Sequence, residues 1–262
     1  MRVLLAILAL AFSSAARAEY AEVNGLKMYY DVQGKGRPLV LLHGGVCTIE
    51  LCLGKVRAPL VKSRRTIAIE QQGHGRTADI ERPLSYEQMA EDTAALLRQL
   101  KVQDADFFGY SMGGSIALRV ALRHPDLVRR VAIFGAGYSN EGMVPGLVES
   151  FKTMKADDIP QQFRDAYAKS APDPAKWPAL VEKIKGLVLN ARDLGAADLR
   201  SIQAPVLVMT ADGDIIRPEH AVEMYRLLPK GHLGVLPVAD HFAPMERPAW
   251  VVSMIRTFYE KK

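Results

Sequence analysis

The pentapeptide Gly109-Tyr110-Ser111-Met112-Gly113 joins a strand-like run, residues 105–108, to a stretch whose apolar residues have helical spacing, residues 115–122. A Gly-x-Ser-x-Gly sequence at such a junction is typical of a sharp turn that exposes its serine as a nucleophile. The outer glycines leave room for the neighbouring helix and strand, and the serine is held in a sparsely populated backbone conformation. The helix start behind it adds free N–H groups and positive dipole potential. We therefore predict a nucleophile at Ser111.

Five short apolar runs predict strands that are buried on both faces, namely residues 39–42, 66–69, 105–108, 131–134 and 206–209. Their lack of alternation favours a mostly parallel sheet covered by helices. Residues 233–238 are expected to supply a last strand, and 86–100 and 250–259 are predicted helices, the first of them capped by Ser85. Near the N-terminus, Asn24-Gly25 between two strand-like runs predicts a hairpin. The predicted fold class is α/β, with helices on both faces of a central sheet.

One long segment, residues 138–200, interrupts this alternation of strands and helices. It shows no strand pattern, and prolines separate several short helical stripes within it. We predict a small helical insertion that acts as a lid. The alternative interpretation is that its apolar faces only pack on the main core.

The first residues have the pattern of a secretory signal peptide. Arg2 is followed by the ten apolar residues 3–12 and by small residues that end in Ala16-Arg17-Ala18, which suits cleavage after Ala18. Ten apolar residues are too few to span a bilayer, and no cysteine follows the cleavage site for a lipid anchor. We therefore predict a signal peptide at 1–18, a domain at 19–262 without a stable membrane anchor, and a secreted or periplasmic location.

The formal net charge excludes some partners. It is +5 for the whole chain and falls to +3 when the two arginines of residues 1–18 are removed, which is too mild to indicate nucleic-acid binding. No His-x-His or His-x-x-x-His spacing is present, so we expect no catalytic metal. No glycine-rich phosphate loop or dinucleotide motif is present, so we expect no cofactor. The oligomeric state stays open.

A serine hydroxyl needs a base within hydrogen-bonding reach and an acid that orients this base. Asp212 and Asp214 follow the predicted strand 206–209, and His241 follows the strand 233–238. Loops at the carboxyl ends of parallel strands converge on one edge of a sheet, where ligands bind. The chain order Ser, Asp, His therefore predicts a triad of Ser111, His241 and one of the two aspartates.

From about residue 22 to the C-terminus, the sequence resembles members of the α/β-hydrolase superfamily through five ordered motifs. These are His43-Gly44-Gly45, the turn 73–77, the pentapeptide 109–113, the acid motif 211–218 and Asp240-His241. At the matching positions, the resemblance assigns the base to His241 and the acid to Asp214, with Asp212 as its rival. It also implies an oxyanion hole formed by the backbone N–H groups of Gly45 and Met112.

These residues suggest a serine hydrolase that cleaves a carboxylic ester or lactone through an acyl-enzyme. Three apolar residues beside the motifs, Val46, Ile216 and Phe242, are expected to line a substrate pocket that favours uncharged small molecules. The same resemblance implies two alternatives, a cofactor-free haloperoxidase or perhydrolase and a slow-turnover ligand receptor on the same fold.

Cys47 and Cys52 are the only cysteines of the chain. In an oxidising compartment they could close a small-loop disulfide. A continuous helix would keep residues five apart from meeting, so two free thiols are the other interpretation.

Overall fold

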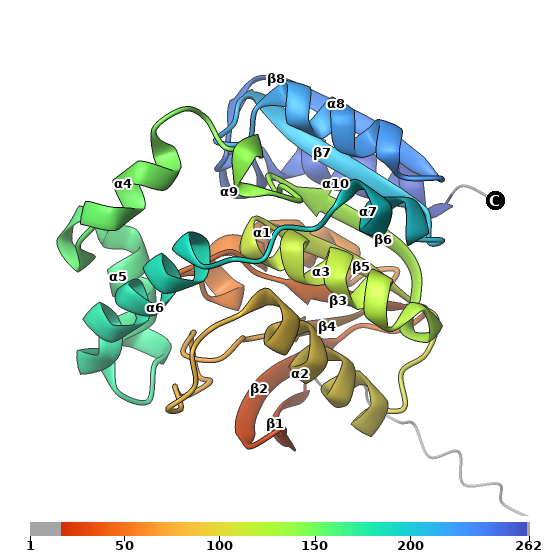
Figure 1. Ribbon diagram of the computed structural model, residues 1–262. Helices are drawn as coiled ribbons and strands as arrows, with labels where there is room; N and C mark the ends of the chain where they lie inside the picture. The colour runs from red at the N-terminus through yellow and green to blue at the C-terminus, as the bar shows by residue number, and fades with distance from the viewer. Residues whose placement is uncertain (1–16, 261–262) are drawn as a thin grey trace, which may run out of the picture.

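The computed structural model describes residues 17–260 of the chain (Figure 1). An eight-stranded sheet runs through the molecule in the order β1-β2-β4-β3-β5-β6-β7-β8. β1 pairs with β2 and β2 with β4 in antiparallel ladders, and the other ladders are parallel. The strands are β1 (Arg17–Val23), β2 (Leu26–Gln33), β3 (Pro38–Leu42), β4 (Arg65–Ile69), β5 (Ala105–Tyr110), β6 (Val128–Phe134), β7 (Val206–Gly213) and β8 (Gly231–Asp240).

The predicted α/β fold is confirmed, and each predicted apolar run lies within a strand. Phe107, Phe108 and Phe134 are completely buried in the core, as expected for strands with helices on both faces. The predicted hairpin joins β1 to β2. Its turn residues Asn24 and Gly25 have φ of 48° and 79°, the left-handed values that a two-residue hairpin loop requires.

Helices cover both faces of the sheet (Figure 1). On one face lie α2 (Tyr86–Gln99), α3 (Met112–Arg123) and α8 (Pro218–Leu227), and on the other lie α1 (Gly54–Leu60) and α10 (Pro248–Glu260). The predicted cap is present, since the Ser85 side chain accepts a hydrogen bond from the N–H of Gln88 at the start of α2. A four-residue helix, α9 (Ala243–Glu246), precedes α10.

The insertion at residues 138–200 contains helices and no strand in the described chain. Its helices α4 (Leu147–Thr153), α5 (Gln161–Ser170) and α6 (Trp177–Leu189) stand together to one side of the sheet, and we call them the cap (Figure 1). One ion pair ties the cap to the main body, because Nζ of Lys183 in α6 lies 2.7 Å from Oδ1 of Asp79. The last helix of the insertion, α7 (Ala196–Ser201), packs on α3 and α8 and so belongs to the main body.

The parallel strands bring the loops that follow them to one edge of the sheet. Leu42 of β3 is in register with both Ile69 of β4 and Gly109 of β5, so the turns after these three strands lie next to one another. β7 and β8 end on the same side. The predicted signal peptide, by contrast, lies outside the described residues except for Arg17 and Ala18, and it stays a prediction.

Candidate active site

Ser111 lies in the turn between β5 and α3, as the pentapeptide predicts. Its φ of 53° and ψ of −120° are a strained conformation for a residue with a side chain. The neighbouring glycines are required by close approach, since a Cβ on Gly109 would collide with the carbonyl of Gly113, and a Cβ on Gly113 would collide with that of Leu42. The turn is held in place by the N–H of Ser111, which donates to the carbonyl oxygen of Phe134 at 2.8 Å.

The side chains of Ser111, His241 and Asp214 form a continuous hydrogen-bonded chain. Nε2 of His241 lies 3.0 Å from Oγ of Ser111, and Nδ1 of His241 lies 2.7 Å from Oδ1 of Asp214. Because an ionised carboxylate only accepts hydrogen bonds, Nδ1 carries the proton and Nε2 presents its lone pair to the serine hydroxyl. This is the arrangement in which an imidazole can remove the proton of a serine.

Asp214 is held in one orientation by its surroundings. The carboxylate is buried and also accepts hydrogen bonds from the hydroxyl of Thr210 at 3.2 Å and from the N–H of Ile216 at 3.3 Å. Gly135, which has φ of 61°, leaves the space that the imidazole needs, because a Cβ there would lie 2.7 Å from Nδ1 of His241. Thr210 and Gly135 were not among the predicted site residues.

Asp212 does not reach the histidine, so its prediction as the rival acid is wrong. Its side chain is exposed, and its two oxygens accept the N–H groups of Val238 at 2.8 Å and Ala239 at 3.1 Å. These hydrogen bonds lower the pKa of Asp212. Asp240 has a similar local role, since its Oδ1 accepts the N–H of Phe242 at 2.8 Å and caps the turn that carries His241.

The turn Gly44–Val46 lies directly beside the serine. A Cβ on Gly44 would be 3.3 Å from Cβ of Ser111. Of the amides on this turn, the N–H of Val46 already donates to Nε2 of His74 at 3.1 Å, whereas the N–H of Gly45 has no acceptor among the described residues. Met112 is the first residue of α3, a position whose N–H has no partner within its helix. Gly45 and Met112, which line the same cavity as Ser111, therefore offer N–H groups without an acceptor among the described residues.

Two buried histidines hold this turn. Nδ1 of His43 lies 2.7 Å from the carbonyl oxygen of Gly44, and its Nε2 accepts the N–H of Gln71 at 3.1 Å. His74 bonds the carbonyl of Gln72 through Nδ1 and the amide of the turn through Nε2. Burial lowers the pKa of His43 to about 4 and that of His74 to about 3. Both rings are neutral at pH 7, each with its proton on Nδ1.

A cavity of about 230 Å³ opens beside Ser111 and His241. Its wall includes no Lys, Arg, Asp or Glu, and it is formed partly by the main body and partly by the cap. The apolar side chains that line it are Val46, Met112, Met143, Phe151, Met154, Ile159, Phe163, Ile184, Leu187, Val188, Ile215 and Phe242. A cavity of this kind suits an uncharged apolar group.

Val46 and Phe242 line the cavity as predicted, but the prediction for Ile216 is wrong. Ile215 lines the cavity in its place. Ile216 is 3% exposed and forms an antiparallel bridge with Met143. Neighbouring residues of an extended segment point to opposite sides, so only one of the two isoleucines can face the cavity.

Comparison with known proteins places the chain in a family. Residues 39–254 match the model of a family described as the alpha/beta hydrolase family. The chain belongs to this family. The family, together with a serine hydrolase and a lactone-degrading enzyme among the relatives below, supports hydrolase activity and points to a small-molecule substrate.

Three relatives are similar to this α/β hydrolase over most of its length. The dihydrolipoyllysine-residue acetyltransferase component of the acetoin cleaving system of Pseudomonas putida is 30% identical over 259 residues, which cover 92% of this chain and 69% of the relative. The serine hydrolase BPHL of Homo sapiens is 26% identical over 245 residues, 89% of this chain and 83% of that one. Among solved structures, Est816, described as an N-acyl homoserine lactone degrading enzyme, has a TM-score of 0.77 at 27% identity and covers 91% of this chain and 99% of its own.

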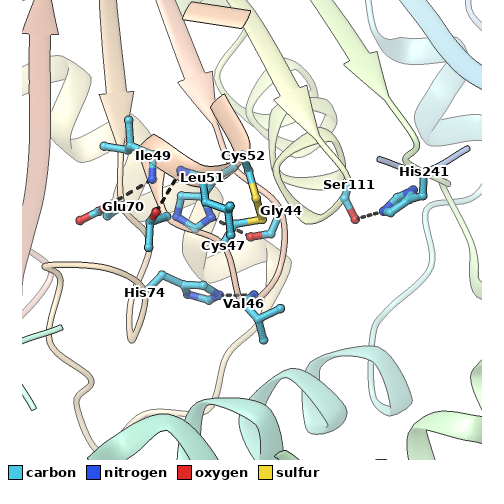
Figure 2. The surroundings of a disulfide bond; sticks show 12 residues. Gly44, Val46, Cys47, Ile49, Leu51, Cys52, Glu70, His74, Ser111 and His241 are labelled. Atoms are coloured by element: carbon cyan, nitrogen blue, oxygen red, sulfur yellow. Dashed lines mark hydrogen bonds between the residues drawn. A yellow bond between two sulfur atoms is a disulfide. The ribbon is translucent and has the colours of Figure 1, made fainter. Parts of the chain in front are cut away.

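The hydrolase contains a disulfide between Cys47 and Cys52, whose Cα atoms are 5.9 Å apart. Figure 2 shows it together with Ser111 and His241. The interpretation as two free thiols is therefore wrong. Cys52 lies in a short π-helical turn, η1 (Ile49–Leu53), and Cys47 precedes this turn, so the two residues do not share the continuous helix that would separate them.

Within residues 17–260 of the hydrolase, no group of three or more His, Cys, Asp or Glu side chains could hold a metal ion. None of the helices found there is long and apolar enough to cross a membrane.

Proposed function

We propose that this α/β hydrolase is a serine hydrolase that cleaves an uncharged carboxylic ester or lactone. The observation that carries the proposal is the pair of hydrogen bonds through His241, 3.0 Å to Oγ of Ser111 and 2.7 Å to Oδ1 of Asp214. A base that bonds both a serine hydroxyl and a buried carboxylate has the geometry for nucleophilic catalysis.

The reaction would proceed in two steps. Oγ of Ser111 attacks the carbonyl carbon while Nε2 of His241 takes its proton, and His241 then gives this proton to the departing alcohol. The negative charge on the carbonyl oxygen of the tetrahedral intermediate is held by the N–H groups of Gly45 and Met112, each worth about 3 kcal/mol in the transition state. Water, deprotonated by His241, then attacks the acyl-enzyme, and His241 returns this proton to Oγ of Ser111 as the acid is released. Throughout, Asp214 keeps the imidazole in the correct tautomer and stabilises the imidazolium.

The cavity supports an uncharged substrate of small or medium size. Its wall offers aliphatic, methionine and phenylalanine side chains and no cation that could pair with a carboxylate. The similarity to Est816, an enzyme described as degrading an N-acyl homoserine lactone, favours including lactones among the substrates to be tested. The similarity to a human serine hydrolase supports the same nucleophile class.

We also propose that the protein is exported to the periplasm or medium. The pattern of residues 1–18 supports this, and so does a disulfide, because disulfides persist in oxidising compartments. Cell fractionation followed by N-terminal sequencing is expected to find Glu19 as the first residue of the exported chain. A chain in the cytosol that still begins at residue 1 would contradict the proposal.

The decisive experiment is labelling with a fluorophosphonate together with turnover of acetyl, butyryl and octanoyl esters and lactones. We expect one label per chain, on Ser111, and turnover that is lost in Ser111→Ala. If the labelled chain shows peroxide-dependent halogenation but no ester turnover, the function is that of a perhydrolase. If it binds esters with a single acylation burst and no further turnover, the function is that of a receptor.

A further inference from the structure

The segment 43–53 carries the proposed oxyanion donor and the disulfide within two residues of each other. Gly45 is followed by Val46 and then by Cys47. All three line the cavity beside Ser111. A change in the backbone of this segment therefore acts directly on the position of the N–H of Gly45.

Val46, between Gly45 and Cys47, has a strained backbone conformation. Its φ is 54°, which is a left-handed conformation that a β-branched residue rarely adopts. Such a conformation persists only where the surrounding structure imposes it, and it is found most often at active sites. If Val46 relaxed to negative φ, the peptide groups on either side of it would turn, and Gly45, whose carbonyl belongs to the first of them, would carry this change to its own N–H one peptide group further on.

Val46 itself is held by a hydrogen bond, whereas the next residue, the buried Cys47, is held by packing and by the disulfide. The N–H of Val46 donates to Nε2 of His74. Among the hydrogen bonds of the described chain, none involves the backbone of Cys47. The cross-link to Cys52 is therefore the fixed point on this side of Val46 (Figure 2).

Cys52 can serve as a fixed point because its own turn is firmly anchored. It is 1% exposed, and its N–H donates to the carbonyl oxygen of Thr48 at 3.2 Å. The same turn is tied to β4 through Ile49, whose N–H donates to Oε1 of the buried Glu70 at 3.3 Å (Figure 2). The turn then continues directly into α1.

We propose that the Cys47–Cys52 disulfide is a positioning element for the oxyanion donor. It keeps Val46 at positive φ and thereby holds the N–H of Gly45 toward the reacting carbonyl, so that reduction of the disulfide lowers kcat. The proposal rests on the function proposed above. It makes hydrolysis dependent on an oxidised cysteine pair, which fits an enzyme that is active after export and weak before it.

Reduction of the disulfide by a small dithiol is a thiol–disulfide exchange that needs no other reactant. The S–S bond of the protein breaks, Cys47 and Cys52 each gain a hydrogen, and the dithiol gives up two electrons and two protons and closes to a cyclic disulfide. Cys47 lines the substrate pocket but is only 2% exposed, so a count of free thiols has to show that the dithiol has reduced the bond.

The first test compares steady-state kinetics of the oxidised and the dithiothreitol-reduced chain, with two free thiols counted in the reduced form. We expect kcat to fall at least about tenfold, because loss of one oxyanion donor costs about 10² to 10³ in kcat, while KM stays within about twofold. The matched control is Cys47→Ala/Cys52→Ala, whose low kcat should not respond to the dithiol. Circular dichroism of both forms checks that the fold is retained. If the double variant fails to fold, the reduction of the natural chain still decides the matter.

The second test asks whether the effect passes through Val46. Glycine adopts positive φ about as readily as negative φ, so Val46→Gly should need the disulfide less. We expect the ratio of oxidised to reduced kcat to drop from about tenfold in the natural chain to about threefold or less in Val46→Gly. A disulfide that only stabilises the fold would give the same ratio in both chains.

A transition-state analogue gives an independent measure. An alkyl trifluoromethyl ketone adds to a catalytic serine and places an oxyanion in the hole, whereas the matching methyl ketone tests only binding in the cavity. Reduction should weaken inhibition by the trifluoromethyl ketone about tenfold and leave the methyl ketone unchanged. If the oxidised chain turns over esters and reduction changes neither kcat nor this inhibition, the positioning role is overturned. If the oxidised chain turns over no ester or lactone, the proposed function itself fails.

Discussion

The backbone N–H of Val46 donates a 3.1 Å hydrogen bond to Nε2 of His74. Because this N–H is engaged, it cannot bind a developing oxyanion, and the N–H of Gly45 is the one that the turn leaves free. The imidazole is fixed in its turn by the carbonyl oxygen of Gln72, which lies 2.9 Å from Nδ1. A buried neutral histidine thus determines which amide of the turn faces the reacting carbonyl.

His74 also predicts how stability depends on pH. Burial lowers the pKa of His74 from its ordinary value of 6.5 to about 3. Between these two values the unfolded chain binds a proton that the folded chain excludes, so this group makes the free energy of unfolding decrease as pH falls below 6.5, by roughly 1 kcal/mol per pH unit. Above pH 6.5 neither state binds the proton, and the contribution of His74 is constant. His43 acts in the same direction down to its pKa of about 4.

Urea unfolding at pH 7.5, 6.0 and 5.0 checks this, with His74→Gln as the comparison. Glutamine can still accept the N–H of Val46 but does not titrate. We expect a shallower dependence on pH in the variant, by roughly 1 kcal/mol per pH unit, because all other titrating groups are shared by the two chains. Parallel curves would mean that His74 is protonated in the folded protein.

The strain at Ser111 gives a prediction that separates catalysis from stability. Replacement by alanine or glycine removes the nucleophile, so both variants should lose covalent labelling and ester turnover. They should differ in stability, because glycine accepts φ of 53° and alanine does not. We expect Ser111→Gly to be more stable than Ser111→Ala by about 1 kcal/mol in thermal or urea unfolding. Equal stabilities would show that the turn is not strained.

The two aspartates after β7 should differ sharply in their effect on catalysis. Asp214→Asn places an amide against Nδ1 of His241 and favours the wrong tautomer, which costs roughly 10⁴ in kcat in a comparable triad. Asp212→Asn weakens two hydrogen bonds to exposed backbone N–H groups and should leave kcat within about threefold. Single-turnover acylation of a chromogenic ester measures both. A larger loss in Asp212→Asn would move the acid to that position.

The fold and the reacting groups could be predicted because the evidence for them is local. A short continuous apolar run indicates a strand buried on both faces wherever it occurs in a chain. The serine turn likewise requires glycines at fixed spacing. The contact between Val46 and His74 could not be predicted, because these residues are 28 apart and meet only when β3 and β4 align. The burial of His220 could not be predicted for a similar reason, since its ring stacks on Tyr138 from a distant segment.

The sequence alone also does not decide which of two nearby residues of the same type takes a role in the site. Asp212 and Asp214 both follow β7, and only the path of the chain after Ala211 decides which carboxylate turns inward. The same applies to the cysteines, where a π-helical turn replaced the continuous helix that would have separated Cys47 from Cys52.

Ile215 and Ile216 are adjacent residues of the same type, so their alanine variants form a closely matched pair for the last prediction. Ile215 lines the cavity, whereas Ile216 is buried, forms a backbone bridge with Met143 and takes no part in the cavity wall. Ile215→Ala should enlarge the cavity and shift kcat/KM from butyryl toward octanoyl esters by about tenfold, since each methylene in an apolar pocket contributes about 1 kcal/mol. Ile216→Ala should leave this ratio unchanged and instead lower the free energy of unfolding by about 2–5 kcal/mol. A variant at Ile216 that changed chain-length preference while stability stayed constant would place Ile216, as the sequence first suggested, in the substrate pocket.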